Sequence, residues 1–95
     1  MSTEHVPVLL FPLGRIVATS NAVSQLTERD IHNAINRHSR ADWGELCEDD
    51  RSANNRALAD GGRLLSVYRS SVGIKFYVIT ETDRSATTVL LPEDY

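Results

Sequence analysis

A cysteine paired with a histidine is a common nucleophile and base, so these residues are the first candidates for chemistry. The only cysteine is Cys47, and His32 and His38 follow one predicted helix. No catalytic signature surrounds Cys47, and acidic residues crowd it, whereas reactive cysteines lie in electropositive settings. The two histidines are six residues apart, about 600° on a helix, so they lie on different faces. We expect no catalytic cysteine, no metal site, and a partly buried His38.

Carboxylates are the second candidates, because a pair of them can act as general acid and base. The spacing alone allows Asp42, Glu45, Glu81 and Asp83 to converge, yet 13 acidic residues among 95 guarantee some proximity by chance. The pair Gly61-Gly62 precedes a predicted strand instead of following one and opening a helix, so it does not resemble a phosphate-binding loop. We therefore expect no catalytic residues and no cofactor.

Two charged segments favour binding to a partner. The turn Glu81 to Ser85 joins two predicted strands, and its alternative interpretation is an ordinary Asp-containing turn. In residues 41 to 50 an aromatic side chain is ringed by carboxylates, which is typical of a contact site; alternatively Trp43 is core and the acids begin the next helix. The candidate partner-binding residues are Asp42, Trp43, Glu45, Glu48, Asp49, Asp50, Asp83 and Arg84.

The charge balance argues against a protein that neutralises nucleic-acid phosphates. Thirteen acidic and ten basic residues give a formal net charge of -3, whereas such proteins usually carry a net basic face. A DNA-binding repressor is a third possibility, since several arginines follow the predicted helices. It would need one face made of Arg29, Arg37, Arg40, Arg51 and Arg56, and interleaved acids would dilute that field.

Residues 63 to 91 organise the predicted fold. Three segments rich in β-branched and aromatic residues, at 63 to 69, 74 to 81 and 86 to 91, are separated by turn residues, which predicts a three-stranded antiparallel meander. In the middle strand Ile74, Phe76 and Val78 share one apolar face by period two, and the other face is mixed. The apolar face needs a cover.

Helices upstream supply that cover. Thr27 and Asp30 resemble a capping box before a one-sided helix at 28 to 39, and a second helix at 48 to 60 stops at Gly61-Gly62. A short helical turn capped by Ser20 or Asn21 and a possible strand at 15 to 18 precede them. Residues 1 to 7 are expected to be frayed. We predict one α+β domain over residues 1 to 95, a three- or four-stranded antiparallel sheet covered on one face by two helices.

The sequence also carries signals about cellular location and assembly. The only apolar run near the start is Val8 to Phe11, without a basic leader, which predicts neither a signal peptide nor a membrane span. A lone cysteine is typical of a reducing compartment, so a cytoplasmic location is expected. A small antiparallel sheet leaves two edges, and an open edge strand would permit a homodimer.

Several stretches of the chain resemble a group of small uncharacterised bacterial proteins borne on plasmids, phages and integrated elements, often labelled plasmid-related or restriction-associated. These stretches are FPLGRIVAT (11 to 19), DWGEL (42 to 46), NNRAL (54 to 58), GGRLLSVY (61 to 68) and ITETDRSATTVLLPEDY (79 to 95). The resemblance transfers no catalytic residue. It implies a mobile-element setting, where small acidic proteins include anti-restriction and anti-CRISPR antagonists that act by binding.

Three functions follow as expectations. The first is a non-enzymatic protein-binding module that inhibits or regulates a host CRISPR or restriction nuclease, because acidic side chains can occupy a groove that normally receives phosphates. The second is a small enzyme of nucleic-acid or nucleotide metabolism that uses Glu81, Asp83 and Arg84, or the two histidines. The third is the DNA-binding repressor.

Overall fold

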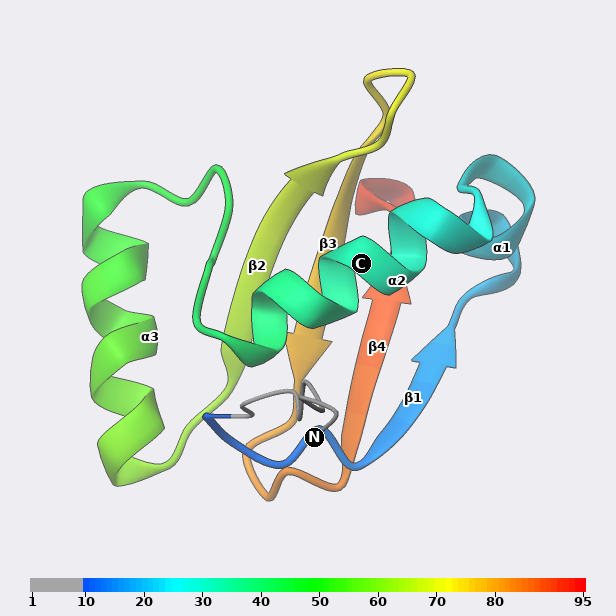
Figure 1. Ribbon diagram of the computed structural model, residues 1–95. Coiled ribbons are helices and arrows are strands. Elements are labelled where there is room, and N and C mark those ends of the chain that lie inside the picture. Colours follow the sequence, from blue (N-terminus) through cyan, green and yellow to red (C-terminus); the bar gives the residue numbers. More distant parts are fainter. Residues whose placement is uncertain (1–9) are drawn as a thin grey trace, which may run out of the picture.

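The computed structural model describes residues 10 to 95, which form an α+β fold (Figure 1). The predicted fraying of residues 1 to 7 lies outside these residues. The elements are, in chain order, β1 (Arg15–Ala18), α1 (Ser20–Gln25), α2 (Glu28–Ser39), α3 (Glu48–Asp60), β2 (Leu64–Arg69), β3 (Lys75–Thr80), β4 (Ala86–Leu90) and the 3-10 turn η1 (Pro92–Asp94). Both long helices begin and end where the sequence predicts, and strands β2 to β4 lie within one residue of their predicted bounds.

The four strands form one sheet in the order β1-β4-β3-β2. Strand β3 pairs antiparallel with both β2 and β4, while β1 pairs parallel with β4, with Arg15 beside Ala86 and Ala18 beside Val89. The expectation of a purely antiparallel sheet is therefore wrong. Period-two alternation identifies a strand, but it does not specify in which direction a distant strand joins the sheet.

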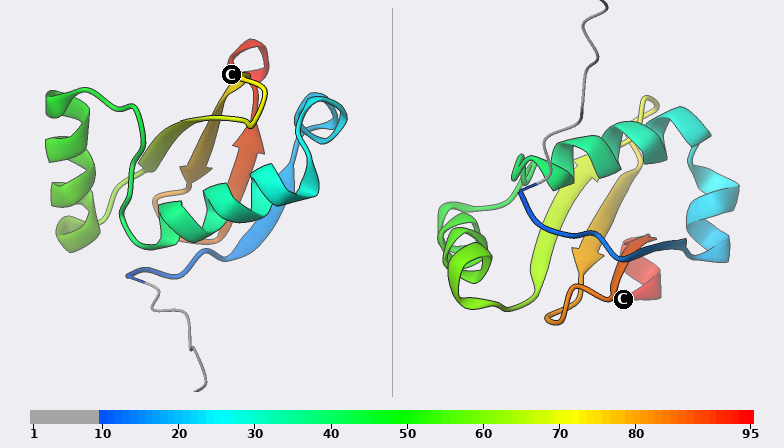
Figure 2. Two further views of the ribbon diagram at one scale, coloured as in Figure 1. Left: turned by 45° about the horizontal axis from the view of Figure 1, so that its top comes forward. Right: turned by 60° about the horizontal axis from the view of Figure 1, so that its bottom comes forward.

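One helix, not two, covers the apolar face of the sheet. Helix α2 lies across that face, whereas α3 stands beside β2 at the edge of the sheet (Figures 1 and 2). The expectation that both helices cover one face is wrong for α3, because α3 has no apolar stripe wide enough to cover a sheet. Its one buried residue is Asn54, and Ala57 and Leu58 are only half-buried.

The core consists of two apolar clusters. Under α2, the cluster contains Phe76 and Val78 of β3 and Val89 of β4, at 1% exposure or less. Phe76 and Val78 share this face as period two predicts. The second cluster contains Phe11, Trp43, Leu46, Leu64 and Val67, so it lies between the segment before β1, the segment before α3, and β2. Each buried side chain of this size contributes ~1.5 to 3 kcal/mol to folding.

Side-chain caps fix where the helices begin. The predicted capping box is confirmed: Thr27 Oγ1 accepts from the Asp30 N–H at 3.0 Å, and Asp30 Oδ2 accepts from the Thr27 N–H at 3.4 Å. Helix α1 begins one or two residues earlier than the predicted cap at Ser20 or Asn21 implies, because Thr19 is its N-cap and accepts from the Ala22 N–H at 3.1 Å. Such caps satisfy amide groups that a helix leaves without partners.

The outer edge of β2 is closed by the chain itself. The buried Asn54 side chain bonds both backbone groups of Leu65, donating to its carbonyl at 2.6 Å and accepting from its N–H at 3.2 Å. Two residues further on, Val67 donates to the Trp43 carbonyl at 3.1 Å and accepts from the Glu45 N–H at 2.8 Å. Asn54 therefore replaces a neighbouring strand at this position.

Asn54→Ala should lower the free energy of unfolding by ~2 kcal/mol or more, because two backbone groups at a buried edge lose their partners. Urea denaturation measures the loss. Asn33→Ala, at an exposed position of α2, is the matched control and should change stability by less than ~0.5 kcal/mol. Equal effects of the two substitutions would contradict the structural role of Asn54.

Candidate functional site

Trp43 lies in the core, which is one of the two interpretations that the sequence left open, and it is therefore not an exposed contact residue. The side chain is 2% exposed, and its ring centroid lies 6.2 Å from that of Phe11 and 5.6 Å from that of His38. Its indole Nε1–H donates to Asn55 Oδ1 at 3.1 Å. The adjacent Gly44 (φ 74°) lets this segment lie on β2, since a Cβ there would meet the Val67 carbonyl oxygen at 1.9 Å.

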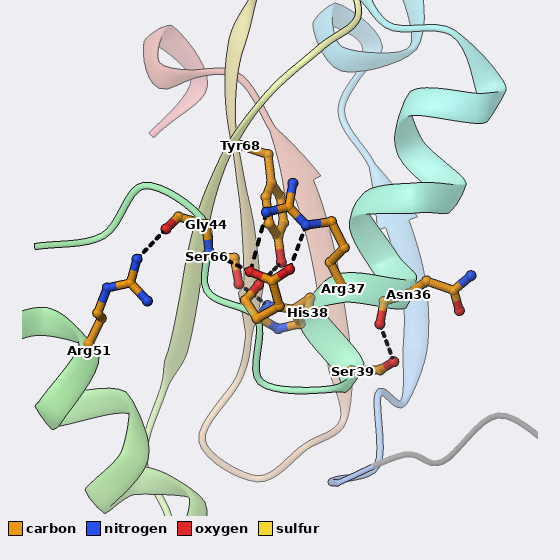
Figure 3. Close-up of polar contacts among 9 residues, drawn as sticks. Asn36, Arg37, His38, Ser39, Gly44, Arg51, Ser66 and Tyr68 are labelled. Atoms are coloured by element: carbon orange, nitrogen blue, oxygen red, sulfur yellow. Dashed lines mark hydrogen bonds and ion pairs between the residues drawn. The ribbon is translucent and has the colours of Figure 1, made fainter.

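Asp42 and Glu45 are exposed but each is paired with an arginine. Arg37 Nε lies 2.8 Å from Asp42 Oδ2, and the guanidinium lies over the Tyr68 ring at 4.6 Å (Figure 3). The hydrogen bond from Arg37 lowers the pKa of Asp42. Arg69 Nε lies 3.1 Å from Glu45 Oε2. Residues 41 to 50 therefore present less unpaired negative charge than their composition indicates.

The Arg84 side chain points toward backbone carbonyl groups of other residues in the chain. Its guanidinium donates to the Gly62 carbonyl, to the Ala57 carbonyl at 3.0 Å and to the Glu81 carbonyl at 3.2 Å. It joins the end of α3 to the turn between β3 and β4, and its backbone has a positive φ of 61°. Arg84 therefore has a structural role that the sequence did not indicate, because both of its Nη atoms donate to carbonyl groups within the chain.

Asp83 occupies an Asp-containing turn. Its Oδ1 accepts from the Ser85 N–H at 3.0 Å, and hydrogen bonds from Ser85 lower the pKa of the carboxyl group. Asp83 and Glu81 both border a shallow depression. Glu81 also forms an ion pair with Arg63, with 3.6 Å between Glu81 Oε2 and Arg63 Nη2. The structure brings these two carboxylates together, and Arg84 does not join them.

The groove that we take as the candidate functional site lies on the face of the sheet opposite α2. It has a volume of about 310 Å³. Strands β2 and β3 supply Leu65, Val67 and Tyr77, and Tyr95 meets Tyr77 edge-on with ring centroids 5.9 Å apart. The rest of its lining is Glu45, Leu46, Cys47, Asp50 and Lys75. An apolar, aromatic wall with a charged rim is the usual composition of a binding site.

The structure therefore brings two of the predicted acids, Glu45 and Asp50, to one groove. Glu48 and Asp49 are exposed beside them in the first turn of α3, and within residues 10 to 95 neither forms an ion pair. Sequence analysis missed Tyr77 and Tyr95 as site residues. The available signal was the mixed second face of β3, where Lys75, Tyr77 and Ile79 alternate with the core residues.

A buried chain of polar side chains runs through the core beside the second apolar cluster. His38 Nδ1 lies 2.5 Å from Ser66 Oγ, and His38 Nε2 lies 2.8 Å from Thr80 Oγ1 (Figure 3 shows His38 and Ser66). Thr80 Oγ1 lies 2.7 Å from Thr87 Oγ1, which donates to the Leu13 carbonyl at 2.7 Å. The four side chains are completely buried.

The last bond of this chain fixes the direction of all the others. A carbonyl only accepts, so Thr87 donates its hydroxyl proton to Leu13, and Thr80 must then donate to Thr87. Thr80 consequently accepts from His38 Nε2–H. Burial lowers the pKa of His38 to about 4, so the imidazole is neutral near pH 7 with its one proton on Nε2, and Nδ1 then accepts from the Ser66 hydroxyl.

Ser66 and His38 have the residue types of a nucleophile and its base, yet solvent does not reach them. His32, by contrast, is exposed on α2, so the two histidines do not converge. No group of three histidine, cysteine or acidic side chains among residues 10 to 95 could hold a metal ion.

The five arginines considered for DNA binding lie on two separate elements, α2 with its C-cap and α3. Arg37 is paired with Asp42, and Arg51 donates to the Leu46 carbonyl at 3.0 Å and to the Gly44 carbonyl at 2.7 Å (Figure 3). These two guanidinium groups therefore have partners within the chain. Within the described part of the chain, each helix is too short or too polar to cross a membrane.

No protein-family model, curated protein or solved structure matches this chain significantly.

Acidification should destabilise the protein through His38. Its pKa is lower in the folded state than in the unfolded state, about 4 against about 6.5, so stability is lost as pH falls through this window. At pH 4.5 the loss should be about 2 to 3 kcal/mol relative to pH 7. Urea unfolding at both pH values measures it. His38→Gln should flatten this pH dependence, because the side chain that gains a proton is removed; an unchanged slope in His38→Gln would contradict the assignment.

Trp43→Ala should lower the free energy of unfolding by ~3 to 5 kcal/mol, because it opens a cavity between Phe11 and His38. Tyr95→Ala, at a side chain that is 73% exposed, is the control and should leave thermal stability nearly intact. Comparing the two melting temperatures checks this. A variant Trp43→Ala as stable as the unsubstituted chain would show that Trp43 is not a core residue.

Proposed function

We propose that this chain is a non-enzymatic protein-binding module whose contact site is the groove lined by Tyr77 and Tyr95. The observation that carries the proposal is the coincidence of an apolar, aromatic groove with an acidic rim. Tyr95 is 73% exposed although its ring packs on Tyr77, and exposed aromatic side chains of this kind are the usual anchors of protein interfaces.

The charge around the groove selects the chemistry of the partner. Asp50 lies on the rim, Glu48 and Asp49 extend the negative surface along the first turn of α3, and Lys75 is the one basic residue of the lining. A partner segment that carries an aromatic or aliphatic side chain next to arginine or lysine would match both features. Charges at such a rim act mainly on the rate of encounter and on specificity.

We further propose that the partner is a host nuclease complex. The resemblance to mobile-element proteins supports an antagonist or regulator of a host CRISPR or restriction nuclease complex, since these complexes present basic grooves for nucleic acid. A formal net charge of -3 suits a protein that competes for such a groove.

Binding to purified host nuclease complexes, measured by surface plasmon resonance, tests the proposal together with phage plaquing with and without the defence system. Tyr95→Ala should weaken binding about 30-fold or more, which corresponds to ~2 kcal/mol at an anchor residue. Asp50→Asn should slow association severalfold and reduce its salt dependence. Asp60→Asn, an exposed acid at the far end of α3, is the matched control and should have a smaller effect.

Melting temperatures of all three variants separate loss of binding from loss of folding. If no complex binds and plaquing is unchanged, the protein is not such an antagonist. If a complex binds and Tyr95→Ala binds equally well, the interface lies elsewhere on the surface.

A further inference from the structure

The two edges of the sheet differ in whether other residues of the chain bond their outward backbone groups. The β2 edge is closed by Asn54 and by residues 43 to 45, as described above. At the other edge, Arg15 donates to the Ser85 carbonyl and Thr19 to the Val89 carbonyl, each at 3.0 Å. The odd-numbered residues of β1 thus face β4, and Ile16 and Ala18 point their backbone groups outward. No hydrogen bond within residues 10 to 95 reaches those outward groups of Ile16 and Ala18. Figures 1 and 2 show no further strand of the described chain beside β1 on this side, and α1 follows at the carboxyl end of β1.

The side chains of this open edge are apolar. Ile16 is 52% exposed and Val17 is 38% exposed, on opposite faces of the strand. Proteins usually protect an open edge with lysine, proline or a bulge, because unpaired strand groups recruit another strand. Within β1 the only charged residue is Arg15. The edge therefore offers both hydrogen-bonding groups and apolar surface to a further strand.

We propose that a second copy of this chain pairs with β1 in antiparallel orientation about a twofold axis at Val17. In this register Ile16 of each copy exchanges two hydrogen bonds with Ala18 of the other, which uses all four outward backbone groups of each strand. The two Val17 side chains face each other across the axis as a non-hydrogen-bonded pair, and the two sheets become continuous.

Charge complementarity selects a second copy over an unrelated peptide. The register places Arg15 of one copy opposite Thr19 of the other, on the same face, with Cβ atoms about 5 Å apart. Thr19 Oγ1 donates to Asp94 Oδ2 at 2.6 Å, and Asp94 Oδ1 accepts from Asn21 at 2.7 Å. An arginine opposite Thr19 therefore reaches a carboxylate held in place by its neighbours. Arg15 forms no ion pair within residues 10 to 95, and the twofold axis makes this contact twice.

Sedimentation equilibrium over a concentration series tests the dimer. The unsubstituted chain should dimerise, and Val17→Lys should weaken dimerisation at least tenfold, because it places two like charges directly opposite each other. Val72→Lys is the matched control: Val72 is 79% exposed at the turn between β2 and β3, so the same substitution there should leave the dimer intact. Circular dichroism checks that both variants fold.

Disulfide formation tests the register in a Cys47→Ser background. Val17→Cys should form a covalent dimer under mild oxidation, because the two Cβ atoms face each other at the axis. Arg15→Cys should not, since the two copies of residue 15 are four positions apart along the strands, about 13 Å. A chain that stays monomeric at all concentrations overturns the proposal. A dimer that Val17→Lys leaves unchanged, or that crosslinks equally through residue 15, overturns the assignment to β1.

Discussion

The hydrogen-bond chain from Ser66 through His38, Thr80 and Thr87 to the Leu13 carbonyl is the constraint on which the rest of this structure depends. It connects α2, β2, β3, β4 and the segment before β1 within the core. A buried polar group without a partner costs ~1 to 3 kcal/mol, so a chain with every group satisfied specifies one arrangement of these elements. A shift of α2 along the sheet would break several of these bonds at once.

The same hydrogen-bond chain uses residues of the types that often act as nucleophile and base, and it holds them inside the core. Ser66 and His38 are enclosed, and Phe11 and Trp43 pack around the imidazole at 5.3 and 5.6 Å between centroids. Arg84, whose guanidinium could have bound an anion, instead donates to four backbone carbonyls within the chain. The proposed binding function rests on exposed groups instead, and Tyr95 and Asp50 line the same groove.

Local structure was predictable from the sequence, and its assembly was not. Helix α2 follows from the Thr27 and Asp30 capping box and from one apolar face, and β3 follows from its β-branched and aromatic composition and from the shared apolar face of Phe76 and Val78. These signals are local. The parallel pairing of β1 with β4 and the position of α3 at an edge depend on contacts between distant residues, such as Asn54 with Leu65, for which composition and periodicity give no signal. Trp43 was ambiguous because an aromatic residue among acids suits either a core or an interface, and only the packing of Phe11 and His38 around it decides.

Nitrogen NMR of the histidine side chains tests the central claim most directly, because it reports which imidazole nitrogen carries the proton. The structure predicts that His38 is neutral with its proton on Nε2, and that it stays so from pH 7 down to about pH 5, because burial lowers its pKa to about 4. A proton on Nδ1, or a His38 that gains its second proton already between pH 7 and pH 6, would contradict the hydrogen-bond chain and the arrangement of the core that rests on it.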